Sequence, residues 1–203
     1  MEHADHCAGG RARRIDRRVA ASPERTESVH GRATLDVRRW CSIGLRITDG
    51  RNGVVVALGG YRGASFAVRA GGRGDVTATH RLWHKPEDIG WLGTGVIYDG
   101  TVYICDTGGV IYCIDAQTGD ILWKRRSDGG GTWSSITQTA DGTMYLLTKS
   151  GTTTVFRPDR EALKRVATNE LNEASNASVV VAGNNVLVRT DQALWCFETP
   201  EQN

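Results

Sequence analysis

The chain has 203 residues, 24% of them charged, and a net charge of +2, a size that fits one substantial domain with a tail. It contains no apolar run of about 18 residues, which excludes a transmembrane helix; apolar windows such as Val54–Leu58 have the length of a strand. Ten of the 25 basic and six of the 23 acidic residues fall within residues 1–46, which leaves 15 and 17 for residues 47–203. The repeat region is therefore close to neutral, and only Lys124-Arg125-Arg126 comes near the basic cluster of a nucleic-acid-binding surface, so we expect no nucleic-acid partner.

Residues 1–46 form an Arg-rich segment with no strand alternation and no apolar helix stripe. No apolar run follows the first basic residues, which excludes a secretory signal peptide, and the acidic residues argue against a transit peptide. Two interpretations remain open: a disordered basic arm, or a stretch that is not native coding sequence and comes from a misplaced start. We favour the second.

From Ile47 onward, short apolar runs alternate with turns. In the first unit we expect strands over residues 53–58, 64–69 and 79–85. The second unit, residues 94–126, has a hairpin turn at Asp99-Gly100 and another at Thr107-Gly108. Its strands are expected over residues 95–98, 101–105, 109–114 and 121–125.

The pattern of the second unit returns at a fixed interval: Tyr103 recurs as Tyr145, and a further step of the same length reaches Leu187. The third and fourth units are expected to contain strands over residues 144–148, 152–156, 163–168, 178–181, 186–189 and 193–197. The fourth unit ends without its last strand. A fixed period of about 40 residues, built from short strands, predicts an all-β protein with a β-propeller fold and one blade per period. Residues 47–203 should therefore form about four four-stranded blades, a partial or half propeller.

The sequence contains five cysteines, and we predict no disulfide among those of the repeats. A two-residue turn at Thr107-Gly108 would pair Cys105 with Val110 and Val102 with Cys113, so that the two sulfurs point to opposite faces of the sheet. Cys196 falls in another repeat. We interpret these three cysteines as small buried apolar residues.

The repeat region shows no nucleophile–base pair, no carboxylate pair in a shared loop and no set of His or Cys residues with metal-ligand spacing. His80 and His84 would share a face of one strand but lie about 13 Å apart, too far to chelate one metal directly. We therefore predict no catalytic, cofactor-binding or metal-binding residue. Binding should fall to the loops at the blade ends.

The longest of these loops are Gly59–Gly63, Pro86–Gly93 and Asp128–Trp133. Trp91 and Trp133 could serve there as exposed anchors for a partner, although core packing is the expected fate of each Trp.

Residues 113–123, CIDAQTGDILW, resemble the repeat of pyrroloquinoline-quinone (PQQ)-type propellers, A-x-D-x-x-T-G-x-x-x-W, with Cys113 in place of the Ala. In this motif Asp115 and Thr118 should hydrogen-bond the turn backbone, Gly119 permits a positive φ, and Trp123 should dock on the neighbouring blade.

The resemblance to bacterial PQQ-like repeat proteins extends from about residue 53 to residue 197. Trp83 fits the role of the repeat Trp in the first unit, and Ala167 stands where a Trp is expected in the third. Such propellers usually close with seven or eight blades. The resemblance therefore implies the C-terminal part of a larger propeller; the alternatives are a dimer of half propellers, which would associate through open edges, or a small ring of four blades.

The resemblance implies a non-catalytic scaffold, periplasmic or secreted, that binds a protein or an extracellular polymer. One alternative is part of a quinoprotein dehydrogenase that holds PQQ and calcium. Its aromatic wall could come from Trp91, Trp133 or Trp195, and its calcium oxygens from Asn169 and Glu170. The other alternative is a sensor domain detached from a larger regulatory protein.

Overall fold

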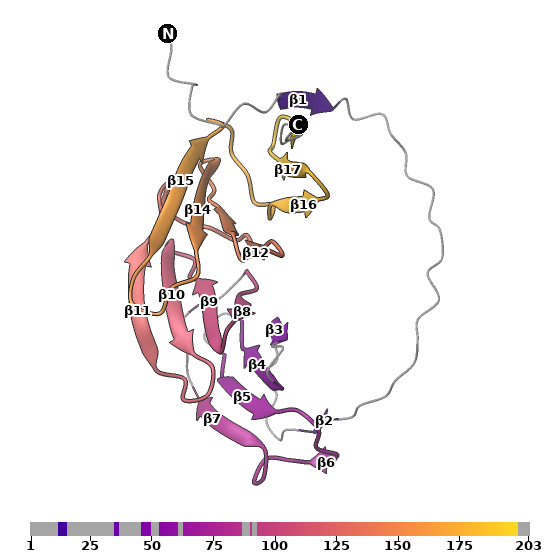
Figure 1. Ribbon diagram of the computed structural model, residues 1–203, viewed down its shortest axis with the longest axis vertical. Coiled ribbons are helices and arrows are strands. Elements are labelled where there is room, and N and C mark those ends of the chain that lie inside the picture. Colours follow the sequence, from indigo (N-terminus) through magenta and orange to yellow (C-terminus); the bar gives the residue numbers. More distant parts are fainter. Residues whose placement is uncertain are drawn as a thin grey trace, which may run out of the picture.

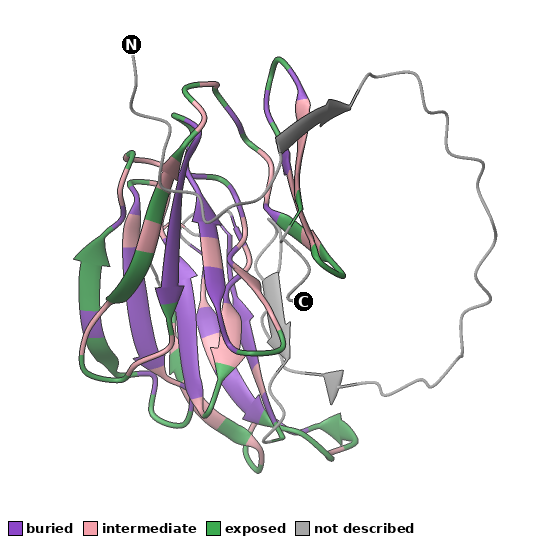
Figure 2. Cartoon of the chain, turned by 45° about the horizontal axis from the view of Figure 1, so that its top comes forward, coloured by how far each residue is buried: buried purple, intermediate pink, exposed green. Residues whose placement is uncertain are grey.

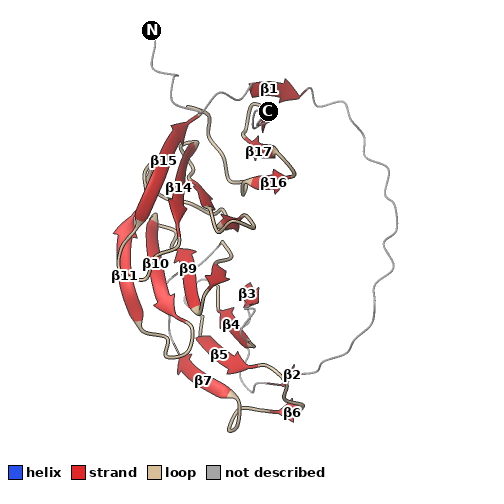
Figure 3. Cartoon of the chain, in the orientation of Figure 1, coloured by secondary structure: helices blue, strands red, loops and turns tan. Residues whose placement is uncertain are grey.

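A computed structural model of the chain describes residues 53–60, 63–86, 90 and 93–198, together with the backbone of three short strands at 12–15, 35–36 and 46–49. This described part consists of strands and turns and contains no helix (Figure 3). The strands form four antiparallel sheets that follow one another along an open arc (Figure 1). The predicted all-β propeller of about four blades is confirmed.

Each sheet is one blade. Blade 1 consists of β3, β4, β5 and β7 (Arg46–Asp49, Val54–Leu58, Ser65–Arg69, Arg81–Lys85). Blade 2 consists of β8, β9, β10 and β11 (Val96–Tyr98, Thr101–Cys105, Val110–Asp115, Ile121–Arg126). Blade 3 consists of β12, β13, β14 and β15 (Thr137–Gln138, Met144–Leu147, Thr152–Arg157, Lys164–Glu170). Blade 4 contains β16, β17 and β18 (Val180–Ala182, Asn185–Arg189, Leu194–Glu198). In every blade the first strand lies on the inner side of the arc (Figure 1).

Strand β1 (Ala12–Ile15) supplies the outer strand of blade 4, although it lies in the Arg-rich segment. It pairs antiparallel with β18, with Ala12 opposite Phe197 and Ile15 opposite Leu194. The sequence predicts a fourth unit without its last strand, because no strand pattern follows Phe197. The structure corrects this: the missing strand comes from a distant part of the chain.

Two further short strands pair outside the blades. Strand β2 (Leu35–Asp36) runs parallel to β6 (Gly74–Asp75), which lies in the connection between β5 and β7. The rest of residues 1–46 lies outside the described residues. Its interpretation as a disordered or non-native segment therefore stays a prediction.

The predicted strands of the repeats agree with the observed ones to within two residues at each end, and residues 101–105 coincide with β9. One difference concerns His80. Strand β7 begins only at Arg81, because a turn precedes it in which the N–H groups of Thr79 and His80 donate to the Val76 carbonyl oxygen (3.2 and 2.9 Å). His80 is therefore a turn residue, not the strand residue that the sequence predicts, and it does not share a strand face with His84.

The turn between β9 and β10 contains four residues, not the predicted two. One carboxylate oxygen of Asp106 accepts the N–H groups of Gly108 and Val110, both at 2.9 Å. Gly109 follows with a φ of +87°, a conformation that glycine adopts at little cost. These bonds fix a longer turn and shift the register of the two strands by one residue.

As a result, Cys105 pairs with Ile111, and Cys113 pairs with Tyr103. The predicted register was wrong: both thiols lie on the same face of blade 2, in the core shared with blade 3. They are nonetheless free and buried, which confirms their interpretation as unpaired core residues, whereas Cys196 is free and half-buried.

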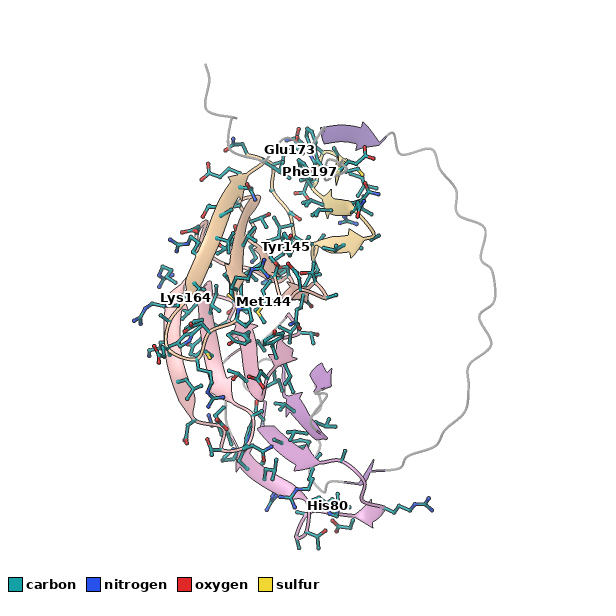
Figure 4. All side chains as sticks on the ribbon, viewed as in Figure 1. His80, Met144, Tyr145, Lys164, Glu173 and Phe197 are labelled. Atoms are coloured by element: carbon teal, nitrogen blue, oxygen red, sulfur yellow. The ribbon has the colours of Figure 1, made fainter. Side chains whose placement is uncertain are left out.

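Each inner blade buries one face against the blade before it and the other against the blade after it. In β9, Ile104 packs on blade 1 and its neighbour Tyr103 packs on blade 3. In β13, Met144 packs on blade 2 and Tyr145 packs on blade 4 (Figure 4). Burial is accordingly concentrated on the central strands (Figure 2). Because each sheet has two apolar faces, stability depends on stacking against neighbours.

A β-bulge between the third and fourth strands recurs at one place in three blades. In blades 1, 2 and 3 the bulge directly follows the third-strand residue that pairs with Trp83, Trp123 and Ala167, respectively. The indole N–H of Trp83 donates to the Ala116 carbonyl oxygen of blade 2, and that of Trp123 donates to the Asp159 carbonyl oxygen of blade 3, both at 2.9 Å. The predicted docking of these two Trp side chains on the next blade is confirmed.

The turn of the repeat motif also has the predicted bonds. One carboxylate oxygen of Asp115 accepts the N–H groups of Gln117 (2.9 Å) and Thr118 (3.1 Å). The Thr118 hydroxyl oxygen accepts the N–H of Asp120 at 3.2 Å, and Gly119 has a φ of +76°. The motif thus builds the blade.

Candidate binding surface at the loop end

The antiparallel strand order gives the arc two distinct ends. At one of them, here called the loop end, the connections between blades and the turns between second and third strands emerge. It comprises connections 86–95, 127–136 and 171–179 and turns 59–64, 106–109, 148–151 and 190–193. All three loops predicted as binding elements lie at this end.

The structure describes these three loops to different extents. In the first, the N–H of Gly59 donates to the Ala64 carbonyl oxygen at 2.9 Å, which closes the loop at its base. In the second, Trp91 lies outside the described residues, so its role as an anchor stays a prediction. The third loop, residues 128–133, is described throughout.

In blades 2, 3 and 4, a backbone hydrogen bond joins the turn between the second and third strands to the connection that precedes the blade. The N–H of Thr107 donates to the Gly90 carbonyl oxygen (3.3 Å). The bond recurs from Lys149 to Gly131 (3.0 Å) and from Asp191 to Ala174 (2.8 Å). The three donors are evenly spaced along the sequence, at the interval of the repeat, so the loop end repeats with the blades. In the described residues, Gly90, Gly131 and Ala174 are thus held against the turns in the same way.

Asp128 holds the connection between blades 2 and 3. One of its carboxylate oxygens accepts the Thr168 hydroxyl (2.6 Å) and forms an ion pair with Arg165 Nε (3.0 Å), both on β15. Gly129 follows with a φ of +77°, and a Cβ there would lie 2.4 Å from the Thr148 hydroxyl oxygen. Only glycine fits at this point without displacing the neighbouring turn.

Trp133 is exposed because its two neighbours are held inward. The hydroxyls of Thr132 and Ser134 both donate to the Leu147 carbonyl oxygen at 2.6 Å, and both residues are buried. The alternation of an extended chain then turns the residue between them outward, and Trp133 is 49% exposed. The expectation of core packing for this Trp was wrong. The sequence signal that could have predicted this exposure is a Trp between two small hydroxyl residues, as in Thr132-Trp133-Ser134.

Lys149 lies beside the exposed indole, in the turn between β13 and β14. Its Nζ is 3.7 Å from the centroid of the Trp133 ring, a cation–π contact. Both groups are exposed, so this pair presents an aromatic face and a positive charge together. No sequence pattern connects these two residues, because the contact depends on how the turn packs against the connection.

Three of the residues considered for a quinone and its calcium, Asn169, Glu170 and Trp195, differ from one another in orientation. Asn169 and Glu170 are adjacent on the outer strand β15, so their side chains point to opposite faces of that strand. The Trp195 indole N–H donates to the Glu173 carboxylate (3.0 Å), and its ring stacks with Phe197 at 6.3 Å in the core between blades 3 and 4. Asn169, Glu170 and Trp195 therefore do not face one shared site.

Within the described part of the chain, no three His, Cys, Asp or Glu side chains gather as metal ligands. The two core thiols are also protected from ionisation. Burial raises the pKa of Cys113 to about 11 and raises that of Cys105 further. Over the same residues, no helix is long and apolar enough to cross a membrane.

Comparison with known families gives a match over most of the chain. A family model described as "Outer membrane protein assembly factor BamB" matches residues 13–124 and 72–199, which together span most of the chain. No curated protein matches the sequence.

Solved structures with propeller folds are similar in shape. BamB from Moraxella catarrhalis has a TM-score of 0.59 and 17% identity over 75% of this chain and 45% of its own. The computationally designed Ika4 protein has a TM-score of 0.57 and 13% identity, over 84% of this chain and 100% of its own. The WD40 propeller domain of Doa1 has a TM-score of 0.54 and 15% identity, over 78% of this chain and 51% of its own. At these identities the likeness shows the fold alone. This chain spans less than half of the BamB structure.

Proposed function

Because the chain belongs to the PQQ-like repeat family described as outer membrane protein assembly factor BamB, we propose that it is a non-catalytic scaffold that binds a protein partner through its loop end. The observation that carries the proposal is the exposed Trp133 with Lys149 against its ring. Binding hot spots are enriched in Trp, because a large rigid aromatic surface is buried at small entropic cost.

The surroundings of Trp133 favour a protein as the partner. The connection that carries it is fixed by Asp128 and by two hydroxyl bonds to the Leu147 carbonyl, so little freedom is lost on binding. The indole and ammonium together fit a peptide surface that offers an apolar side chain and a carboxylate. We place this activity in the periplasm or outside the cell, in keeping with the family description.

Photo-crosslinking in the source cells tests the proposal. A photoreactive phenylalanine analogue replaces Trp133 in one variant and Ile121 in another. Ile121 is the matched control, because it is 45% exposed but lies next to the opposite end of blade 2. We expect a discrete protein adduct from position 133 and none from position 121. Equal labelling from both positions, or none from position 133, would reject the loop end as the binding surface.

The partner identified in this way then serves in a binding assay with purified protein. Trp133→Ala should weaken binding at least tenfold, and Ile121→Ala less than twofold. The non-catalytic part of the proposal is tested separately with PQQ and calcium, followed by tryptophan fluorescence. Saturable quenching in the micromolar range would contradict it.

A further inference from the structure

We propose that the outer strands β7, β11 and β15 hold this protein against a lipid bilayer that carries negatively charged headgroups. The contact surface is the convex side of the arc, where the last strand of each of these blades lies (Figure 1). A protein bound in this way lies on the bilayer and does not cross it. The proposal does not depend on the loop end or on the proposed function.

Positive charge is concentrated on the outer strands. The part of the chain whose side chains the structure describes contains 13 basic and 13 acidic residues, so it is balanced. The three outer strands hold seven of these basic residues and one of the acidic ones. The other described positions therefore hold six basic and twelve acidic residues. A neutral arc is thus divided into a positive convex side and a negative remainder, which favours one orientation on an anionic surface.

Five of these positive charges have no acidic partner. We call them the basic rim: Arg81 and Lys85 on β7, and Lys124, Arg125 and Arg126 on β11. The ion pairs of the described residues form at other basic side chains, including both of those on β15. Lys85 and Arg126 donate to the carbonyl oxygens of Gly119 (2.5 Å) and Gly108 (3.1 Å), which are neutral acceptors. The charge of the basic rim therefore remains available to an external anion.

The charges are spread along the rim and do not converge on one point. Lys124 and Arg126 alternate with Arg125 on β11, so the three side chains leave both faces of an exposed strand (Figure 2). Lys85 reaches the end of blade 2 opposite the loop end, whereas Arg126 reaches the loop end. A small anion would contact only part of this row. A bilayer presents many headgroups in one plane, and each Lys or Arg near an anionic bilayer strengthens binding about fivefold.

Exposed aliphatic side chains lie beside the basic ones. The bulge in blades 1, 2 and 3 inserts one unpaired residue into the outer strand: Leu82, Leu122 and Val166, respectively. Leu82 packs on the core between blades 1 and 2, but Leu122 is 38% exposed and Val166 is 59% exposed. Basic and aliphatic side chains together are typical of proteins that lie in a membrane interface. An acidic protein partner would favour aromatic anchors, and no aromatic side chain of these three strands is exposed.

Co-sedimentation of the full chain with lipid vesicles tests the proposal directly. One set of vesicles contains about 30% phosphatidylglycerol in phosphatidylcholine, and the other contains phosphatidylcholine alone. We expect binding to the phosphatidylglycerol vesicles that weakens at least tenfold when the salt concentration rises from about 0.05 M to about 0.3 M, because salt screens the attraction. No binding to these vesicles, or equal binding to both sets, would overturn the proposal.

Two triple variants of equal net charge locate the contact. One carries Lys124→Gln, Arg125→Gln and Arg126→Gln, and the matched control carries Arg69→Gln, Arg73→Gln and Arg189→Gln at exposed positions off the outer strands. The rim variant should bind the phosphatidylglycerol vesicles at least about thirtyfold more weakly than the unaltered protein, and the control less than about fivefold more weakly. Both keep the Arg-rich residues 1–46, and both should keep the thermal midpoint, because the substituted residues are exposed. Equal dissociation constants would mean that the rim does not make the contact, and the proposal would fail.

The aliphatic contribution is tested without any change of charge. Leu122→Ser with Val166→Ser should weaken binding to the phosphatidylglycerol vesicles at least fivefold, because both side chains would otherwise enter the interface. Tyr98→Ser with Val180→Ser is the matched control, since these residues are 39% and 52% exposed but lie on the inner strands β8 and β16. A loss as large in the control as in the outer pair would contradict the convex side as the membrane-facing surface.

A soluble polyanion distinguishes a bilayer from an acidic protein segment. Poly-glutamate offers carboxylates on a flexible chain, with neither a plane of headgroups nor an apolar layer. At a carboxylate concentration equal to that of phosphatidylglycerol, it should leave most of the protein on the vesicles. Displacement of the protein at this concentration would show that the basic rim prefers an acidic chain, and the membrane proposal would be wrong.

Discussion

At the scale of single residues, one tryptophan position connects the blades. Trp83 and Trp123 lie opposite the recurring bulge and donate to a carbonyl of the next blade. Trp123 is 5% exposed and packs with Tyr103 at a centroid distance of 6.1 Å. Blade 3 has Ala167 at this position, so the two Trp contacts hold the first three blades together.

Replacement of this Trp should be costly. Trp123→Ala creates a cavity between blades 2 and 3 and removes the bond to Asp159, so the free energy of unfolding should fall by about 3–5 kcal/mol. Trp133→Ala removes an exposed ring and should change it by less than about 1 kcal/mol. Urea titrations of both variants measure the difference. A loss for Trp123→Ala as small as that for Trp133→Ala would mean that the indole is not a core residue.

Gly119 is constrained by its φ and by close packing. Its φ is +76°, and a Cβ there would lie 2.8 Å from the Trp83 ring. Gly119→Ala should therefore lower the free energy of unfolding by more than Gly100→Ala, whose φ is +70° with open space around it. The control should cost about 1 kcal/mol. Equal losses in urea titrations would show that the Trp83 contact relaxes freely.

Asp115 should make stability depend on acidity. Burial acts to raise its pKa, but hydrogen bonds from Arg160 and from the N–H groups of Gln117 and Thr118 outweigh this and hold the pKa below its ordinary value of 3.8. The carboxylate therefore stabilises the fold above about pH 4, and this contribution is lost as the pH falls through the lower folded value. Asp115→Asn should show a smaller loss of unfolding free energy between pH 7 and pH 3 than the unaltered protein. Asp120→Asn, at an exposed position, is the control and should lose as much unfolding free energy as the unaltered protein. An equal loss for Asp115→Asn and the unaltered protein would contradict the role assigned to Asp115.

At the scale of elements, the sequence predicts the strands of the repeats well, because alternation and Asp-Gly turns are local signals. It predicts the role of Trp123, because the motif from Cys113 to Trp123 carries its own turn bonds. It does not predict the register of β9 with β10, because the turn length depends on two backbone N–H groups that donate to the Asp106 carboxylate. It also misses the exposure of Trp133, which depends on a carbonyl in the next blade.

The outer strand of blade 4 could not be predicted from local pattern either. Residues 12–15 contain three charged or small residues and acquire a strand conformation only by pairing with β18. Removal of residues 1–15 should leave the edge of β18 unpaired and lower the thermal midpoint by at least about 3 °C. Removal of residues 1–11 keeps β1 and should leave the midpoint unchanged. Equal midpoints for both truncations would show that β1 adds nothing to blade 4.

At the scale of the whole molecule, three blade interfaces and one loop end follow the single period of the repeat. The core clusters join blades 1 and 2, 2 and 3, and 3 and 4, while the turn-to-connection bonds repeat along the loop end. The repeat thus builds the arc, and we expect the residues that depart from the repeat to determine which partner the loop end binds. Trp133 is such a departure, because Ser175 repeats the bonds of Thr132 before blade 4 and Asn176 therefore occupies the place that corresponds to Trp133.

The most direct test of a scaffold that binds through this end is hydrogen exchange of the chain, alone and in the complex isolated from its source cells. We predict slower exchange in the complex at residues 127–136 and 148–151, around Trp133 and Lys149, and no change at the opposite turns, residues 116–120. Protection confined to residues 116–120 or to the outer strands would contradict the account.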